Sequence, residues 1–296
     1  MTAASRLLEE QGIEYRPGFQ HGMAEDAVIA AEASSSARAR RSLLLWSATA
    51  FVVLCALDVA RAALWTYGAD TGTFAQIVLD AFGGMRNGIE HGTHYRYHWS
   101  PALAVLWPFV AATHSALALQ FVQAAATVAA APLVYALVAP RAGADVALRA
   151  AILTLLYPPL VAVGWGEFHE IGLFPMLALG ALVTADRRCW GWFAVCVAAA
   201  AGLREDVCIE FILAGAALGI ARWRSRRAWF AAAAAAAASL ALYYAVVLPR
   251  AGGRWIPAHF YTYAFASGPL TLLAAPVTHP REAARALLTF GRFTYV

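Results

Sequence analysis

Short polar segments stand out from a chain that is otherwise largely apolar, and their residue types are those of acid/base chemistry. The segment Glu167-Phe168-His169-Glu170 sets two carboxylates around an imidazole, which suits a general acid/base pair or a set of metal ligands. The segment Arg204-Glu205-Asp206 places a guanidinium beside two acids, and an arginine can hold a phosphate through two parallel hydrogen bonds. Each segment is also explained as a polar cluster that satisfies its own charges.

A further candidate is Asp70, which lies three residues before an expected helix start. Thr73-Phe74-Ala75-Gln76 has the form of a capping box, and apolar residues recur at helical spacing as far as Phe82. We expect this amphipathic helix to lie on the outer membrane surface. Because a helix N-terminus offers free N–H groups to an anion, Asp70 and a bound lipid-linked phosphate would be neighbours. The alternative is that Asp70 is only a turn residue.

Histidines are concentrated in one short segment. His91, His94 and His98 lie within eight residues, beside Glu90. On a helix this spacing would face one way and could hold zinc or another divalent ion. A surface loop would tolerate the same histidines without any metal. No cofactor is certain from the sequence, and a divalent metal ion is the only one that it indicates.

The composition places these segments in a membrane. Of the 296 residues, 61% are hydrophobic and 14% are charged, against about 25% charged in soluble proteins. This excludes a cytosolic enzyme and a disordered or disulfide-stapled chain, and it predicts an all-α, polytopic bundle of transmembrane helices. The net charge of +4 comes from arginines in clusters without interleaved aromatics, so membrane lipids are expected partners and nucleic acid is not.

Alternation of apolar runs and arginine clusters predicts about seven spans. Arg38, Arg40 and Arg41 precede the first span, and arginine clusters belong on the cytoplasmic side. The N-terminus is therefore expected in the cytoplasm, and the protein in a bacterial plasma membrane. The segment Pro101–Thr113 is too short to span and predicts a re-entrant or interfacial helix. The expected spans are Ser42–Leu64, Ser115–Val138, Val146–Val163, Ile171–Ala185, Gly191–Leu203, Val207–Ala221 and Ala228–Leu248.

Two domains follow from this map. Residues 1–41 are expected to form a disordered cytoplasmic tail, and residues 42–296 a transmembrane domain. The segment Arg281–Val296 resembles the approach to a further span, so we expect the domain to be truncated at its C-terminus.

The order of the motifs resembles that of a known family. Tyr67–Gln76, His98-Trp99-Ser100-Pro101, Glu167–Glu170, Arg204–Asp206 and Pro249–Gly253 are similar to segments of an uncharacterised family of bacterial and archaeal polytopic membrane proteins. The resemblance covers roughly residues 43–296. That family is similar in layout to the GT-C glycosyltransferases, which use an acid in the first extracytoplasmic loop and a polyprenyl-phosphate sugar as donor. Asp70 matches that acid, although no second carboxylate adjoins it here.

The resemblance implies a GT-C-like glycosyltransferase acting on the extracytoplasmic face. Asp70 and Glu170 would be catalytic, while His98, His169, Arg204 and Glu205 would bind substrate. These six residues should line one outward-opening cavity. Two other functions remain open. A transporter or flippase would need a polar path, yet the spans contain few ionisable residues, and a non-catalytic scaffold would leave the polar cluster without a role. The ionisable residues within the spans are Asp58, Arg61, Arg149 and Glu210.

Overall fold

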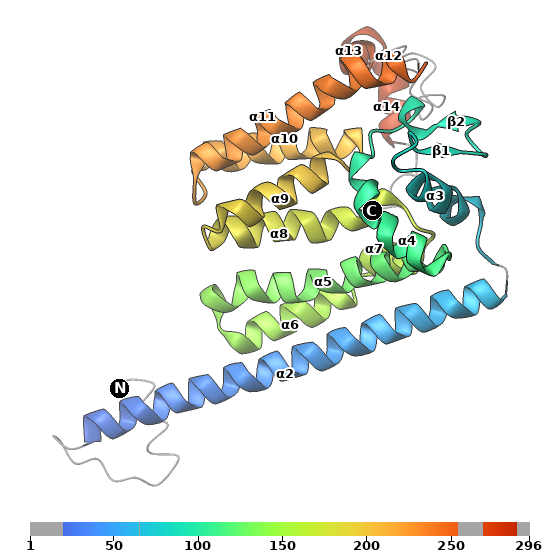
Figure 1. Ribbon diagram of the computed structural model, residues 1–296. Coiled ribbons are helices and arrows are strands. Elements are labelled where there is room, and N and C mark those ends of the chain that lie inside the picture. Colours follow the sequence, from blue (N-terminus) through green and yellow to red (C-terminus); the bar gives the residue numbers. More distant parts are fainter. Residues whose placement is uncertain (1–19, 65, 254–268, 289–296) are drawn as a thin grey trace.

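The computed structural model describes residues 20–64, 66–253 and 269–288, which are almost entirely helical (Figure 1). The first helix, α2, runs from Gln20 to Ala63 over 44 residues. The helix therefore begins 22 residues before Ser42 and includes residues 20–41, which the sequence analysis assigns to a disordered tail. The segment from Met23 to Ala63 contains no glycine or proline and is rich in alanine and arginine, which are good helix formers.

The main bundle consists of helices that run back and forth, with α5 at its centre (Figure 1). Helix α5 packs against α2, α6, α7 and α8, while α10 packs against α11. Helix α11 continues through a π-helical turn, η4, into α12. The bounds are α5 Leu117–Ala142, α6 Ala144–Leu155, α7 Pro158–Trp165, α8 Phe174–Asp186, α9 Trp190–Ala201, α10 Glu205–Ile220, α11 Arg226–Leu242, η4 Tyr243–Val247 and α12 Leu248–Arg250.

Three helices are long and apolar enough to cross a membrane: Ala33–Ala63, Leu117–Ala142 and Arg226–Arg250. Helices α6 and α7 make a fourth if they count as one span, although they meet at an angle of 51°. Pro158 and Pro159 explain the break, because a proline disfavours helix in the residue before it. The remaining expected spans form helices of 12 to 16 residues, so about seven spans is not confirmed.

The outer surface of the bundle is apolar. Leu44, Leu153 and Leu213 are each about two-thirds exposed, although they lie on helices of the bundle. A soluble protein rarely exposes apolar surface on this scale. These side chains are suited to contact with lipid, in agreement with a membrane protein.

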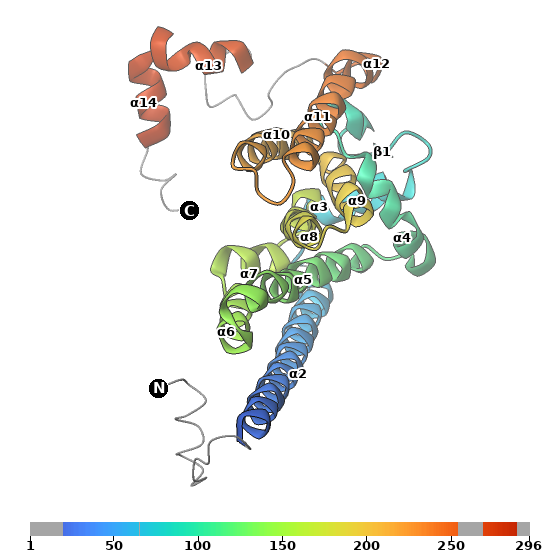
Figure 2. The same cartoon turned by 90° about the vertical axis from the view of Figure 1, so that its left-hand side faces the viewer.

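Arginines join the helices at one end of the bundle, which Figure 2 views with the helices roughly end-on. Arg141 at the end of α5 and Arg224 in the turn before α11 both lie 2.6 Å from Asp186, the last residue of α8. The turns around Arg188 and Arg222 lie at the same end (Figure 1). The arginine clusters therefore share one end, as the alternation of spans predicts.

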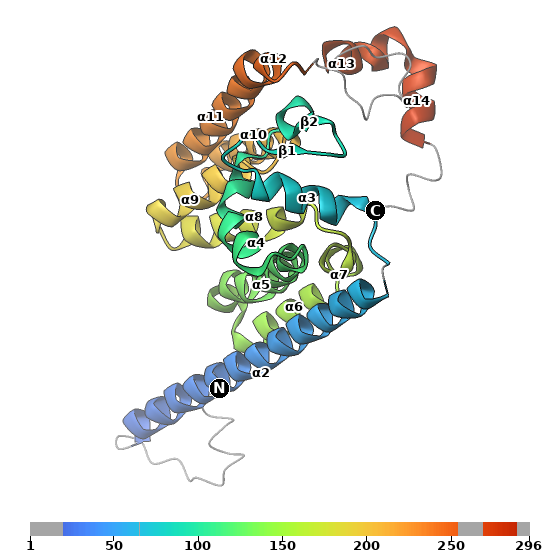
Figure 3. The ribbon, with the colours of Figure 1, turned by 45° about the vertical axis from the view of Figure 1, so that its right-hand side comes forward.

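Short elements cap the opposite end. Helix α3 crosses this end, and a small hairpin lies between α3 and α12 (Figure 3). The segment Pro101–Thr113 is helical throughout, and its buried Leu103 and Val110 pack against α3. The bounds are α3 Ala69–Leu79, β1 Arg86–Asn87, β2 Gly92–Thr93, η1 His94–Arg96, η2 Pro101–Leu106, α4 Trp107–Thr113 and η3 Glu170–Leu173.

Helix α3 differs from its prediction in where it begins and ends. It begins at Ala69, and Thr73 donates its hydroxyl to the carbonyl of Ala69 (2.8 Å) instead of capping. Its apolar residues Phe74, Ile77 and Val78 are buried against the rest of the protein. Protein rather than lipid therefore covers the apolar face, and the position of α3 at the membrane surface stays a prediction. The expected apolar stripe reaches Phe82, but α3 ends at Leu79 and Phe82 is 79% exposed.

The chain beyond Gly253 is described only in part. Helices α13 (Pro269–Thr278) and α14 (Pro280–Leu288) pack against each other. The segment Arg281–Val296, predicted to approach a further span, forms part of α14 as far as Leu288. Its remainder lies outside the described residues.

Candidate active site

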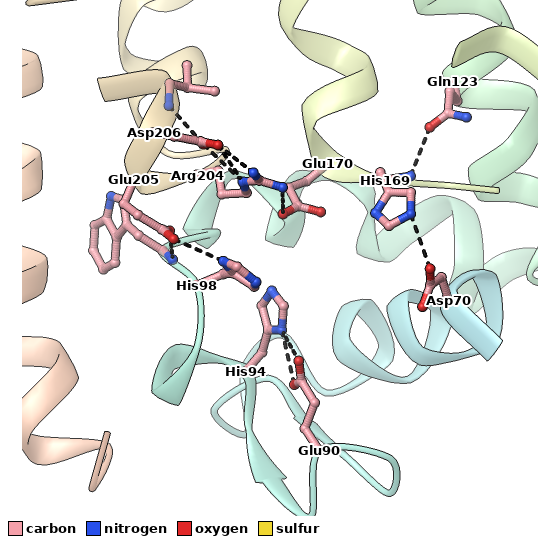
Figure 4. A network of polar contacts seen from close by, with 12 residues as sticks. Asp70, Glu90, His94, His98, Gln123, His169, Glu170, Arg204, Glu205 and Asp206 are labelled. Carbon is pink, nitrogen blue, oxygen red and sulfur yellow. Dashed lines mark hydrogen bonds and ion pairs between the residues drawn. The ribbon is translucent and has the colours of Figure 1, made fainter. Parts of the chain in front are cut away.

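The polar loops meet at the end of the bundle opposite the arginine-rich turns (Figures 1 and 4). They contribute a connected set of ion pairs and hydrogen bonds from four separate parts of the chain. The sequence predicts that these residues line one cavity; the structure shows the clustering, and the cavity stays a prediction. The residues brought together are Asp70, His98, His169, Glu170, Arg204 and Glu205.

Asp70 and His169 form the most accessible pair. The imidazole Nε2 of His169 lies 3.2 Å from a carboxylate oxygen of Asp70, and the two side chains are 46% and 57% exposed. The backbone N–H of His169 donates to the side chain of Gln123 in α5 (2.9 Å). Phe74 of α3 packs edge-on against the imidazole. The pair is thus positioned by two helices and remains open to a substrate, as proton transfer requires.

Glu167 holds the N-terminus of α3. Its carboxylate accepts hydrogen bonds from the backbone N–H groups of Gly68 (2.5 Å), Asp70 (3.0 Å) and Thr71 (3.3 Å). Free N–H groups at a helix start attract an anion, and here the anion is a side chain of the protein. The prediction that a lipid phosphate rests at this N-terminus is therefore wrong, because Glu167 already occupies it.

Glu170 and Arg204 form the inner part of the site. Only 1% of the Glu170 side chain is exposed, and its Oε1 lies 3.8 Å from a guanidinium nitrogen of Arg204. Arg204 also binds Asp206 through both of that residue's carboxylate oxygens. The second oxygen of Glu170 is buried and has no hydrogen-bond partner among the residues that the structure describes. This oxygen is a free acceptor beside a cation.

His98 and Glu205 form a second inner pair. The imidazole Nδ1 of His98 lies 3.0 Å from Glu205, which also accepts the backbone N–H of Trp99 (3.0 Å). Burial alone would lower the pKa of His98, but the hydrogen bond and charge of Glu205 outweigh it and raise that pKa. Burial would likewise raise the pKa of Glu205, yet the contact with His98 lowers it. Both effects favour the charged pair.

The remaining histidines do not complete a metal site. His94 is buried and its Nδ1 lies 3.0 Å from Glu90, whereas His91 is exposed. The pKa of Glu90 is lowered because hydrogen bonds from His94 and Asn87 outweigh the opposing effect of burial. Across residues 20–64, 66–253 and 269–288, no group of three or more His, Cys, Asp or Glu residues could hold a metal ion. The structure therefore does not gather His91, His94 and His98 around a metal.

Sequence reasoning missed the residues that position the site. Gln123 is buried, donates to the carbonyls of Val163 (2.7 Å) and Glu167 (3.1 Å), and accepts the N–H of His169. Gln120, one helical turn away, hydrogen-bonds to Thr71 of α3 (2.9 Å). Two glutamines at this spacing in an apolar span were the available signal, because buried amides need partners.

The fold and the polar end together define a helical membrane protein whose ionisable residues gather on one side of its bundle. The chain belongs to the family described as predicted membrane protein (DUF2079), whose model matches residues 63–295. The expected membership in an uncharacterised membrane-protein family is thereby confirmed. No curated protein and no solved structure matches the chain.

Proposed function

We propose that this protein is a membrane-embedded, GT-C-like glycosyltransferase that takes a sugar from a polyprenyl-phosphate donor. The observation that carries the proposal is the accessible Asp70–His169 pair beside the buried Glu170, which has an unpartnered oxygen. A general base and a free acceptor at one place suit the activation of a hydroxyl group. About seven spans, a cytoplasmic N-terminus and a bacterial plasma membrane belong to the same proposal.

The chemistry assigns a role to each part of the site. Asp70 takes the proton of the acceptor hydroxyl, and the resulting oxygen forms a bond to the anomeric carbon. The bond from that carbon to the phosphate oxygen breaks, and the phosphate leaves with the electron pair. His169 holds Asp70 in place, as the 3.2 Å contact supports.

The inner residues suit a sugar better than a phosphate. Glu170, Glu205 and Asp206 surround the single guanidinium of Arg204, so the surroundings are rich in negative charge. Carboxylates accept hydrogen bonds from hydroxyl groups, whereas they repel a phosphate. We therefore assign Arg204, Glu205, His98 and His169 to binding of the sugar and its acceptor, and Glu170, together with Asp70, to catalysis.

The test is transfer from a labelled polyprenyl-phosphate sugar by the purified chain in nanodiscs. Asp70→Asn should reduce the rate by about 10²- to 10⁴-fold, the usual effect of losing a positioned general base. Its melting temperature should stay near that of the wild type, because the side chain is exposed and the replacement has the same shape. Asp145→Asn, at the arginine-rich end, is the matched control and should transfer normally. Undiminished transfer by Asp70→Asn would remove Asp70 from the mechanism.

A further inference from the structure

A pocket of about 340 Å³ is lined by residues of the hairpin region and of the end of α11–α12. Each side of the pocket contributes one arginine, and the α12 side adds the apolar Val247 and Ala251. The proposed function leaves this pocket unused. It is lined by Gly83, Gly84, Arg86, Thr93, Tyr95, Val247, Arg250 and Ala251.

Two arginines line this pocket, Arg86 from the hairpin and Arg250 from α12. Arg141, Arg204 and Arg224 each lie within 4 Å of a carboxylate. Arg86 and Arg250 form no ion pair with any residue in the described part of the chain. Both guanidinium groups are therefore available to an anion in the pocket.

The two walls of the pocket are fixed to each other, although they lie about 150 positions apart in the sequence. Trp99, just after η1, donates its indole N–H to Ser239 of α11 (2.8 Å) and packs against the ring of Tyr243. At Gly253 a side chain would clash, because an added Cβ would lie 2.8 Å from the carbonyl oxygen of Arg96. The pocket is thus a built feature of the fold.

The level of the pocket relative to the membrane indicates which ligand it can bind. Arg250 is the last residue of the apolar helix Arg226–Arg250, so it lies where the hydrocarbon ends and the polar headgroups begin. Guanidinium groups bind phosphates bidentately, while the Val247 and Ala251 side chains offer apolar surface to an attached alkyl chain.

We propose that the Arg86–Arg250 pocket binds the phosphate group of a phosphate ester, with a prenyl-type chain extending into the adjoining lipid. This deepens the proposed glycosyltransfer and rests on it for the choice of a lipid-linked phosphate. It moves the phosphate subsite away from α3, whose N-terminus Glu167 occupies. The sugar then extends from the pocket toward the carboxylates of the active site.

The test measures binding of geranyl phosphate and of inorganic phosphate to the full chain in phosphatidylcholine nanodiscs, by calorimetry. Arg86→Gln and Arg250→Gln should each weaken geranyl phosphate binding by about 10- to 100-fold, as expected for hydrogen bonds to a charged group. Arg96→Gln removes the same charge from the same region outside the pocket, and should change the Kd by less than about threefold. Ala251→Leu, which narrows the pocket and keeps both charges, should weaken binding as well.

The outcomes separate this inference from the proposed function. Wild-type affinity in Arg86→Gln and Arg250→Gln, or no binding of either probe, would overturn the pocket. Equal affinity for inorganic and geranyl phosphate, lost in the same variants, would support the anion site and refute the lipid chain. Arginine-dependent binding without any sugar transfer would support the pocket and refute the glycosyltransferase. Transfer with an unchanged KM in both arginine variants would support the glycosyltransferase and refute the pocket.

Discussion

Each paired histidine of the site has a carboxylate of its own. His94 contacts Glu90, His98 contacts Glu205 and His169 contacts Asp70. These contacts differ in exposure, from the buried His94 to the accessible His169. A buried imidazole–carboxylate pair contributes to stability, whereas an accessible one is available for proton transfer. The differences in exposure thus separate structural pairs from the reactive one.

The His98–Glu205 pair predicts a stability optimum in mildly acidic solution. His98 has a raised pKa, so its contribution is complete below its ordinary value of 6.5 and is lost as the pH rises through the folded value. Glu205 has a lowered pKa, so its contribution is complete above 4.5 and is lost as the pH falls through the folded value. The melting temperature in detergent should therefore peak between these two values.

Glu205→Gln should flatten this optimum and lower the free energy of unfolding by about 1–3 kcal/mol, because charged hydrogen bonds to His98 and Trp99 are lost. Asp145→Asn removes an exposed carboxylate at the arginine-rich end of the bundle and should leave the profile intact. If the melting temperature of Glu205→Gln still fell on both the acidic and the alkaline side of the optimum, other groups would be the cause.

The sequence largely predicted which residues lie in the candidate active site, but it did not predict the contacts between them. Alternation of the spans places the loops of Asp70, His169 and Arg204 on one side, which explains why they meet. The role of Glu167 could not be predicted, because it depends on α3 lying across a loop that follows about 100 positions later. Likewise, the spacing of the histidines gave no sign that His94 would be buried while His91 stayed exposed.

Among the elements, α3 depends on an anchor outside itself. Glu167→Ala leaves the N–H groups of Gly68, Asp70 and Thr71 without their acceptor. The free energy of unfolding should fall by about 0.5–2 kcal/mol, the usual cost of losing a helix cap. Amide exchange at these residues should accelerate. Glu167→Gln keeps one carbonyl oxygen and should have a smaller effect; equal exchange rates in the wild type and Glu167→Ala would contradict this anchoring.

Helices α10 and α11 depend on a glycine for their close approach. A Cβ at Gly215 would lie 2.8 Å from the backbone oxygen of Trp229, whereas Gly191 has open space around it. Gly215→Leu should therefore cost at least about 1–3 kcal/mol, as overpacking does, and lower the melting temperature. Gly191→Leu is the control and should melt near the wild-type temperature. Similar melting in both variants would show that the helix pair adjusts freely.

The local sequence predicted the helices more reliably than it predicted how many of them cross the membrane. The apolar runs of the main bundle are helical, with glycine, proline or arginine clusters at their boundaries, and only Val146–Val163 divides into two helices, α6 and α7. Whether α8, α9 and α10 cross the bilayer depends on its local thickness and on neighbouring helices. Hydropathy reports neither quantity, so a short run such as Trp190–Ala201 cannot be counted from its residues alone.

For the whole molecule, the shared end of the arginine clusters predicts its orientation. The exposed native Cys189 and an introduced Ser225→Cys both lie at that end. Neither should react with an impermeant maleimide in intact cells, because positive clusters stay on the cytoplasmic side. Ile89→Cys, at an exposed position of the hairpin, should react. Labelling of Cys189 or position 225 before lysis would reverse the orientation and place the candidate active site in the cytoplasm.

The two ion pairs of Asp186 hold one end of the bundle more firmly than the other. It fastens the ends of α5 and α8 to the turn before α11, while the far ends of these helices carry loops. Helix α8 has 13 residues and is therefore about 20 Å long. A tilt of about 5° around its fastened end displaces the other end by about 2 Å, more than a hydrogen bond tolerates. Such a tilt would break the contacts of His169 with Asp70 and Gln123. Asp186 therefore helps to keep the candidate active site assembled from the opposite end of the bundle.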